Sequence, residues 1–149
     1  MKLVIKVAIQ ILKPVDEVFE AIVNPEKMCH YFISESSGKM EEGKKLIWKF
    51  PEFEEKVPVR IDKVEKNKFV SFFWDGEQGK ETLVEMELIP QHQHATLVRI
   101  HEGRQEGNDL DVKWLSQNTE GWTNFLACLK AYLEYGINLR KGAFDYMKT

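Results

Sequence analysis

Residues 109–135 read DLDVKWLSQNTEGWTNFLACLKAYLEY, the longest segment of the chain with one continuous pattern. Its large apolar residues return every three or four positions, which is the spacing of one face of an α-helix. The residues that set this period are Leu115, Trp122, Phe125, Leu126, Leu129, Tyr132 and Leu133. Asp109 or Asp111 can cap the first turn, and Gly136 can end the last one. A helix of about 25 residues is roughly 40 Å long and can cross a whole sheet.

Two residues of this helix need separate comment. Gly121 lies in its middle, where glycine costs about 1 kcal/mol relative to alanine, so something should offset that cost. We expect close packing of a strand or of the Trp122 indole against the helix backbone, and the alternative is the close approach of a ligand. Trp114 is expected near the exposed first turns.

Upstream of the helix, apolar residues alternate with polar ones, which is the period of half-buried β-strands. The predicted strands cover residues 2–12, 44–50, 56–64, 69–74, 81–89 and 95–102. Turn residues separate them, among them Gly38, Gly43, Pro51, Asp75-Gly76 and Pro90. Pro58 demotes part of its strand to an edge or a bulge. Short turns between strands indicate an antiparallel meander with one face in water.

Two short helices are predicted directly after the first strand. Pro14 is suited to a helix start, and Val15, Val18, Phe19 and Ile22 follow at helical spacing. Asn24-Pro25 ends that helix, and a second one is expected from Pro25 to about Tyr31. Because no repeat or linker interrupts the chain, we expect residues 1–149 to form a single domain.

The composition is typical of a globular protein and excludes several classes. The 149 residues are 43% hydrophobic and 30% charged, with only 9 Gly and 5 Pro, which excludes disordered and collagen-like chains. A net charge of -3 without a basic stripe argues against a nucleic-acid partner. Nine Phe, four Trp and four Tyr are many rings for one small domain, so they either fill a core or line a pocket.

The two cysteines and the apolar segments bear on location. Cys29 and Cys128 are too few for a disulfide framework, and they indicate thiols of a reducing compartment. The N-terminal segment is interrupted by Lys6 and Gln10, and no small-residue cleavage site follows it. No run of residues approaches the length of a membrane span, so we expect a cytoplasmic protein without membrane insertion.

Local motifs add a resemblance that covers residues 3 to 136. They are KPVDEVFEAI at 13–22, Gly38 with Gly43 before a strand, Phe72-Phe73-Trp74 before a turn, and Glu120-Gly121-Trp122 followed by Leu126 and Leu129. Together with the order of the predicted elements, the chain resembles the START-like (SRPBCC) superfamily. The branch that it resembles is the one related to the C-terminal domain of the heat-shock protein 90 ATPase activator.

The resemblance implies an α+β helix-grip fold. In that fold a curved antiparallel sheet of about six to seven strands wraps around the long C-terminal helix, and two short helices follow the first strand. Many members of the superfamily hold an apolar ligand in a cavity between sheet and helix. Combined with the strand register, this predicts ten ligand-binding residues: Trp48, Phe50, Phe72, Trp74, Met86, Ile100, Glu102, Asn118, Trp122 and Leu126. The alternative is that these side chains pack together and leave no cavity.

Glu102 and Asn118 are the polar members of this set. If the alternation of Val98 and Ile100 continues, Glu102 faces inward, and Asn118 lies one helical turn before Trp122. A buried carboxylate beside an amide can bind a polar ligand group or act as a general base. One carboxylate without a partner specifies no reaction, and the alternative is that Glu102 lies in solvent at the strand end.

The remaining reactive residues do not form a catalytic or cofactor site. His92-Gln93-His94 falls in an expected exposed loop without a third ligand, so we predict no metal site. Cys128 lies on the apolar face of the helix, and Cys29 is nearer a possible cavity mouth without an assured basic partner. No nucleophile elbow or glycine-rich phosphate loop occurs in the sequence, so no catalytic residue and no cofactor is predicted.

Three functions follow from these observations. The first is a non-enzymatic or at most weakly specialised protein that binds a small hydrophobic or aromatic ligand between sheet and helix. The second is a chaperone-associated protein-binding module of the heat-shock protein 90 ATPase activator type. The third is a cyclase-like or hydrolase-like enzyme that uses the same cavity. A monomer and a homodimer are both compatible with the sequence.

Overall fold

The structure is a computed structural model, and it describes residues 3–75, 81–104 and 109–148. Within these residues seven strands form one antiparallel sheet in the order β1-β7-β6-β5-β4-β3-β2. The strands are β1 (Leu3–Ile11), β2 (Glu35–Ser36), β3 (Lys45–Lys49), β4 (Lys56–Glu65), β5 (Phe69–Asp75), β6 (Glu81–His92) and β7 (Ala95–Arg104). Because β1 pairs with β7, the first strand forms one edge of the sheet and β2 forms the other.

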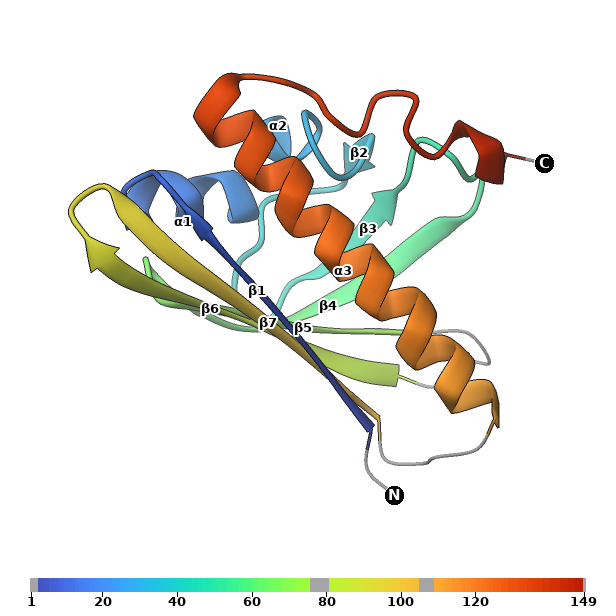
Figure 1. Cartoon of the computed structure of the whole chain (residues 1–149). Helices are drawn as coiled ribbons and strands as arrows, with labels where there is room; N and C mark the ends of the chain where they lie inside the picture. The colour runs from blue at the N-terminus through green and yellow to red at the C-terminus, as the bar shows by residue number, and fades with distance from the viewer. Residues whose placement is uncertain (1–2, 76–80, 105–108, 149) are drawn as a thin grey trace.

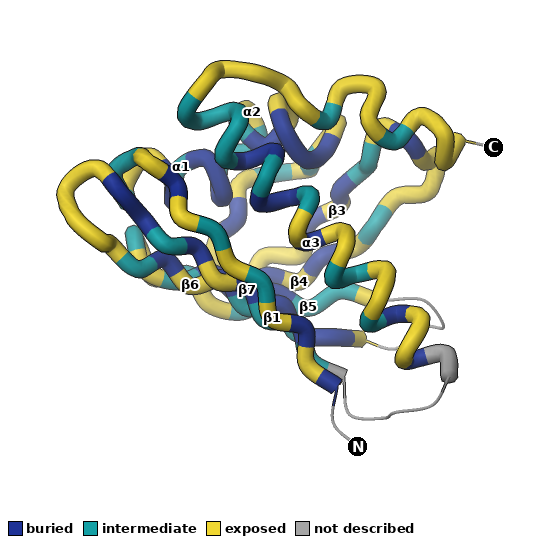
Figure 2. The backbone as a smooth tube through the Cα atoms, viewed as in Figure 1, coloured by how far each residue is buried: buried dark blue, intermediate teal, exposed yellow. Residues whose placement is uncertain are grey.

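Three α-helices accompany this sheet. They are α1 (Val15–Val23) and α2 (Pro25–Met28) after β1, and α3 (Asp109–Tyr135) after β7. A short 3₁₀ helix, η2 (Asp145–Met147), lies near the C-terminus. Figure 1 shows α3 crossing one face of the curved sheet. Figure 2 shows buried and exposed positions alternating along α3. This is the predicted α+β helix-grip fold. None of the helices in the described part of the chain is long and apolar enough to cross a membrane.

The strand alternation decides which side chains form the core, as predicted. In β6 the buried positions are Thr82, Val84, Met86 and Leu88, and the residues between them are exposed or half-buried. The strand extends three residues beyond the predicted end at Ile89, and its pairing with β7 is irregular after Pro90. Pro58 pairs only with β3, because the β5 ladder begins at Val59, so it lies on a local edge where no N–H is needed.

Both short helices begin where the prolines predicted, within one residue. Pro14 precedes the first residue of α1, and Pro25 is the first residue of α2. The Asn24 side chain caps α2 by accepting a hydrogen bond of 3.0 Å from the Glu26 N–H. Regular helix ends at Met28 rather than near Tyr31, because the chain continues from there as turns.

The first turns of α3 differ from the sequence prediction. Trp114 is only 2% exposed, so the expectation that it lies near an exposed helix start was wrong. The reason is periodicity, because Trp114 precedes Asn118 and Trp122 at four-residue steps and shares their face of the helix. Asp111, on the same face, is also fully buried. The Asp109 side chain, a possible helix cap, lies outside the described part of the structure. Gly76 of the predicted turn also lies outside the described residues.

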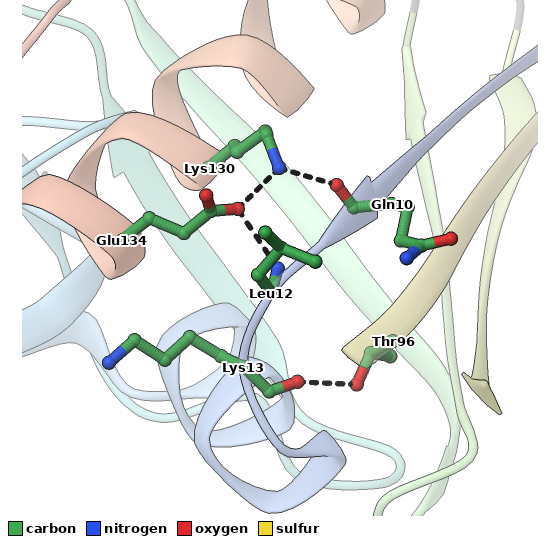
Figure 3. A network of polar contacts seen from close by, with 6 residues as sticks. All are labelled: Gln10, Leu12, Lys13, Thr96, Lys130 and Glu134. Atoms are coloured by element: carbon green, nitrogen blue, oxygen red, sulfur yellow. Dashed lines mark hydrogen bonds and ion pairs between the residues drawn. The ribbon is translucent and has the colours of Figure 1, made fainter. Parts of the chain in front are cut away.

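Helix α3 ends at the predicted glycine, and its last turns are hydrogen-bonded to the end of β1 and the residue after it. Gly136 has a φ of 64°, and its N–H donates to the Tyr132 carbonyl at 2.9 Å, so this glycine ends the helix. One turn earlier, Glu134 accepts the Leu12 N–H at 2.9 Å and pairs with Lys130, which also donates to the Gln10 carbonyl at 2.7 Å (Figure 3). Burial alone would raise the pKa of Glu134, but these contacts together hold the pKa below its ordinary value.

Candidate functional site

Glu102 lies near the end of β7 and has no solvent exposure. Its carboxylate accepts four hydrogen bonds. Oε2 accepts from Trp74 Nε1 at 2.8 Å and from Thr82 Oγ1 at 2.5 Å. Oε1 accepts from Trp122 Nε1 at 2.9 Å and from Asn118 Nδ2 at 3.0 Å. The prediction that Glu102 faces inward is confirmed, and the alternative that it lies in solvent was wrong.

The register of the elements explains why these donors converge. Trp74 and Thr82 are directly opposite each other on β5 and β6, and Val84 of β6 is opposite Glu102 on β7. Asn118 and Trp122 are four residues apart on α3, so both side chains lie on the same helix face. Three strands and one helix therefore meet at a single carboxylate.

This arrangement restricts what Glu102 can do chemically. An ionised carboxylate has about four acceptor positions, and all four are occupied here by uncharged donors. To accept a proton from a substrate, Glu102 would have to lose one of these buried hydrogen bonds, which costs free energy. The geometry therefore favours a carboxylate that orients two indole rings over one that acts as a general base.

A pocket of about 270 Å³ lies between α3, the end of β3 and the C-terminal segment. Most of its wall is aromatic, with an amide, a guanidinium and one glycine. The lining residues are Phe32, Phe50, Phe53, Trp74, Asn118, Gly121, Trp122 and Arg140. Such a lining of rings with few polar groups is typical of small-molecule sites.

The ten predicted ligand-binding residues divide into three groups. Phe50, Trp74, Asn118 and Trp122 line the pocket. Glu102 lies behind them and bonds three of them. The other five are at most 2% exposed and form the core that supports the pocket: Trp48, Phe72, Met86, Ile100 and Leu126. The interpretation that these side chains pack together and leave no cavity therefore describes the five core residues, but not the four residues that line the pocket.

The three inward tryptophans pack in a row, and two of them, Trp74 and Trp122, border the pocket. The ring centroids of Trp48 and Trp74 are 6.3 Å apart, and those of Trp74 and Trp122 are 5.4 Å apart. Phe72 packs edge-on against Trp48 at 5.3 Å. Edge-to-face and tilted pairs at these distances are favourable, so the rings form a rigid aromatic wall.

No strand packs closely against Gly121. A Cβ atom added at this position would have no heavy atom within 4 Å, its two chain neighbours and the nearby helix backbone apart, although the residue lies in the middle of α3. The expected packing of a strand onto the glycine was therefore wrong, whereas packing of the adjacent Trp122 indole against the helix backbone stays a prediction. Gly121 instead borders the pocket, which leaves the alternative that a ligand approaches the helix backbone here.

Three pocket residues were not found by sequence reasoning. Phe32 follows α2 in a turn, and Phe53 lies in the loop between β3 and β4, where 42% of it is exposed. Arg140 lies in a turn that follows α3. None of the three lies in a helix or strand, so no periodicity could have placed them.

Arg140 is paired within the pocket wall. Its Nη2 lies 2.6 Å from Glu52 Oε1, and the exposed fractions of the two side chains are 15% and 4%. The guanidinium also lies over Phe50, with its carbon 5.5 Å from the ring centroid, and over Phe144 at 4.9 Å. The pair is therefore neutral as a unit and largely removed from water.

The histidines and cysteines give no further site. His92 and His94 are exposed, and the described residues contain no group of His, Cys, Asp and Glu side chains that could hold a metal ion. Cys128 is buried, and burial raises the pKa of its thiol more than nearby Arg140 lowers it. Cys29 is exposed, but partial desolvation and the charge of Glu35 raise the pKa of its thiol as well. Neither thiol is activated as a nucleophile.

Comparison with known proteins gives a family and a set of similar structures. The sequence model of the family described as activator of Hsp90 ATPase homolog 1-like protein matches residues 13–134. The crystal structure of protein SSP2350 from Staphylococcus saprophyticus is 31% identical, with a TM-score of 0.78 over 92% of this chain and 96% of that one. No curated protein matches the sequence.

Two further structures extend this comparison. DynU16, from the dynemicin biosynthetic locus, is 26% identical with a TM-score of 0.79, over 90% of this chain and 48% of that one. The solution structure of the Aha1 dimer from Colwellia psychrerythraea is 20% identical with a TM-score of 0.73, over 90% and 98% of the two chains. At that identity the Colwellia structure supports the fold alone.

Proposed function

The chain belongs to the activator of Hsp90 ATPase homolog 1-like family, and from this premise we propose that it binds a small hydrophobic or aromatic molecule in the pocket beside α3. The family fold supports a ligand-binding type of domain. The ligand would lie on Gly121, between the faces of Trp74 and Trp122 on one side and Phe50 on the other. Burial of rings against rings is the proposed mechanism of binding.

The hollow above Gly121 is the observation that carries this proposal. Glycine in a helix interior normally costs stability, and here no strand or other residue distant in the chain packs on it closely enough to offset the cost. The space that a side chain would occupy is bordered by aromatic rings instead. A ligand that contacts the bare helix backbone accounts for both facts.

The size of the pocket indicates the size of the ligand. A volume of about 270 Å³ lies just below the usual range for small-molecule sites, which suits a compound of one or two rings. Burial of about 300 Å² of apolar surface would contribute roughly 7 kcal/mol before the entropic costs of binding are subtracted. Without those costs, about 7 kcal/mol corresponds to a Kd of roughly 10 μM, so we expect weaker binding after them, toward the millimolar range.

Intrinsic fluorescence tests the proposal directly. Trp74 and Trp122 border the pocket, so 2-naphthol and similar two-ring compounds should change the tryptophan emission and raise the melting temperature. Gly121→Leu fills the hollow and should abolish both changes. Thr123→Leu adds the same side chain on the opposite, exposed face of α3 and should preserve them. Equal binding by the two variants would show that the ligand does not occupy this pocket.

An enzymatic role for the same cavity has weaker support. The only predicted catalytic candidate, Glu102, has all four acceptor positions occupied by buried donors. Asn118, the other polar candidate, uses its amide N–H to hold that carboxylate. With both groups engaged in this way, neither is free to accept a proton from a substrate. The cyclase-like or hydrolase-like alternative would gain support if a turnover measured for the wild-type protein were lost in Glu102→Gln.

A chaperone-associated module is the other alternative, and the family description is what supports it. It predicts a large exposed apolar patch. A pull-down with heat-shock protein 90 and an ATPase assay distinguish it from ligand binding, and no binding at micromolar protein would count against it. Location in the cytoplasm is also a proposal, supported by the two free thiols Cys29 and Cys128.

A further inference from the structure

The segment after α3 runs beside the pocket and contributes Arg140 to its wall. Residues 137–148, here called the C-terminal strap, follow Gly136 and include η2 (Asp145–Met147). Figure 1 shows the strap turning back from the end of α3 and passing above β2 and β3 toward the C-terminus. Phe144, Tyr146 and Met147 of the strap border a neighbouring hollow, which shares Arg140 with the pocket.

The strap is attached to the rest of the molecule mainly through Arg140. Its backbone hydrogen bonds are largely internal, such as Ala143 N–H to the Arg140 carbonyl at 2.9 Å. Several of its apolar side chains face solvent, with Leu139 50% and Tyr146 73% exposed. Arg140, in contrast, is buried against Phe50 and paired with Glu52 at 2.6 Å. One side chain thus provides the principal tertiary anchor.

Arg140 also separates three hollows. It lines the aromatic pocket of about 270 Å³, a hollow of about 200 Å³ on the side of Cys29 and Glu52, and one of about 560 Å³ bordered by Phe144 and Tyr146. Phe53, Asn118 and Gly121 belong to both the first and the third hollow. Withdrawal of Arg140 would therefore join separate spaces into one longer groove.

The anchored state carries an internal penalty. Arg140 Nε is buried and has no hydrogen-bond partner among the described residues. A buried N–H without an acceptor destabilises the conformation that contains it. Release of the strap would return this group, and the Glu52 carboxylate, to water. The anchor therefore consists of one ion pair and two ring contacts, and the unsatisfied donor weakens it.

We propose that the C-terminal strap is the gate of the pocket and that the Arg140–Glu52 pair sets the size of ligand admitted. With the pair formed, the pocket accepts compounds of one or two rings. Larger ring systems enter only after Arg140 leaves Glu52 and the hollows merge. This inference rests on the proposed function, since it concerns access to the same pocket.

The test uses two probes that differ in size but not in polar group, 2-naphthol with two fused rings and 1-hydroxypyrene with four. Stopped-flow tryptophan fluorescence measures their association with the full chain. For wild-type protein the rate for 1-hydroxypyrene should level off with concentration, because opening limits it. In the double variant R140M/E52Q that rate should rise at least about tenfold, as an open state of about 10% becomes the main one. The 2-naphthol rate should change far less, so the ratio of the two rates separates access to the pocket from the loss of Arg140 as a lining group.

A matched control pair exists on the other side of the molecule. Arg60 pairs with Glu81 at 2.7 Å and lies over Phe73 with 4.2 Å to the ring centroid, so R60M/E81Q removes the same kinds of contact outside the pocket. It should bind both probes like wild type. The double variants remove both charges of each pair, so neither leaves an unpaired carboxylate.

Trypsin cleavage after Lys141 reports strap release independently of any ligand. It should accelerate at least about tenfold in R140M/E52Q and stay unchanged in R60M/E81Q. The gate is overturned if 1-hydroxypyrene enters wild type and R140M/E52Q at the same rate, or if cleavage is equally fast in both. If 2-naphthol does not bind wild-type protein at all, the proposed function fails and the gate fails with it.

Discussion

Replacement of Gly121 by alanine is expected to stabilise the protein. The residue lies in the interior of α3, and a Cβ atom there would meet nothing within 4 Å. The change therefore adds no clash, while alanine favours helix over glycine by about 0.8–1.0 kcal/mol. We expect the free energy of unfolding to rise by about 0.8–1.0 kcal/mol, which raises the melting temperature by roughly 2–4 °C for a chain of this length.

The same substitution at Gly136 should have the opposite effect. Gly136 has a φ of 64°, a conformation that costs residues with a Cβ about 1–2 kcal/mol. Alanine also reduces the freedom of the unfolded chain, which returns about 0.4–1 kcal/mol. Gly136→Ala should therefore lower the free energy of unfolding by about 1 kcal/mol, although a Cβ there also meets open space.

Urea unfolding followed by far-ultraviolet circular dichroism measures both variants, since the backbone signal does not depend on the tryptophans in the pocket wall. The midpoint should move up for Gly121→Ala and down for Gly136→Ala, with an unchanged slope. A Gly121→Ala variant less stable than wild type would refute the reasoning, because it would mean that the added methyl group meets an obstacle and that the hollow does not exist.

Three further predictions concern ionisable groups. Glu102→Gln should lower the free energy of unfolding by about 2–6 kcal/mol, because the amide oxygen can accept only two of the four hydrogen bonds and two donors remain unpaired. The control Glu87→Gln, on the exposed face of the sheet, should be nearly neutral in the same urea titration. The pKa of Glu134 is lower in the folded state than the unfolded value of about 4.3, so its contribution is complete above that pH and is lost as the pH falls through the folded value. Glu134→Gln should therefore reduce stability at pH 7 and flatten its decline in acid, and parallel curves for variant and wild type would contradict this. With iodoacetamide, Cys29 should be alkylated well before Cys128, as mass spectrometry of the peptides can show; equal labelling rates would mean that the α3 face opens readily.

Strand and helix periods were sufficient to predict the inner part of the site. The alternation of β7 placed Glu102 on the inward face of the sheet. The four-residue step in α3 placed Asn118 and Trp122 on the helix face that is turned toward the sheet. The same step also applies to Trp114, and the prediction failed there because proximity to a helix end was given more weight than helical phase. Phase decides burial along α3, because the helix rests on the sheet from its first turns.

The outer part of the site was beyond such reasoning for a physical reason. Phe53 and Arg140 lie in irregular segments, where side-chain direction follows from individual turns rather than from a repeat. The pairing of Glu52 with Arg140 joins positions 88 residues apart in the chain, and the local sequence around either residue does not predict it. Gly121 shows a different limit, because a helix glycine indicates that something unusual occurs there but not whether it is tight packing or open space.

In the proposed ligand complex, the two ends of the pocket would contribute differently to binding. At the inner end, Trp74 and Trp122 each have one N–H, and both N–H groups are used by Glu102. A ligand there meets only ring faces and carbon edges, so shape and stacking decide affinity, and variation among apolar ring compounds should be tolerated. Polar discrimination has to come from Asn118 and Arg140. Since Arg140 also holds the strap, a change at this residue should alter which ligands enter and which polar groups are accepted at the same time.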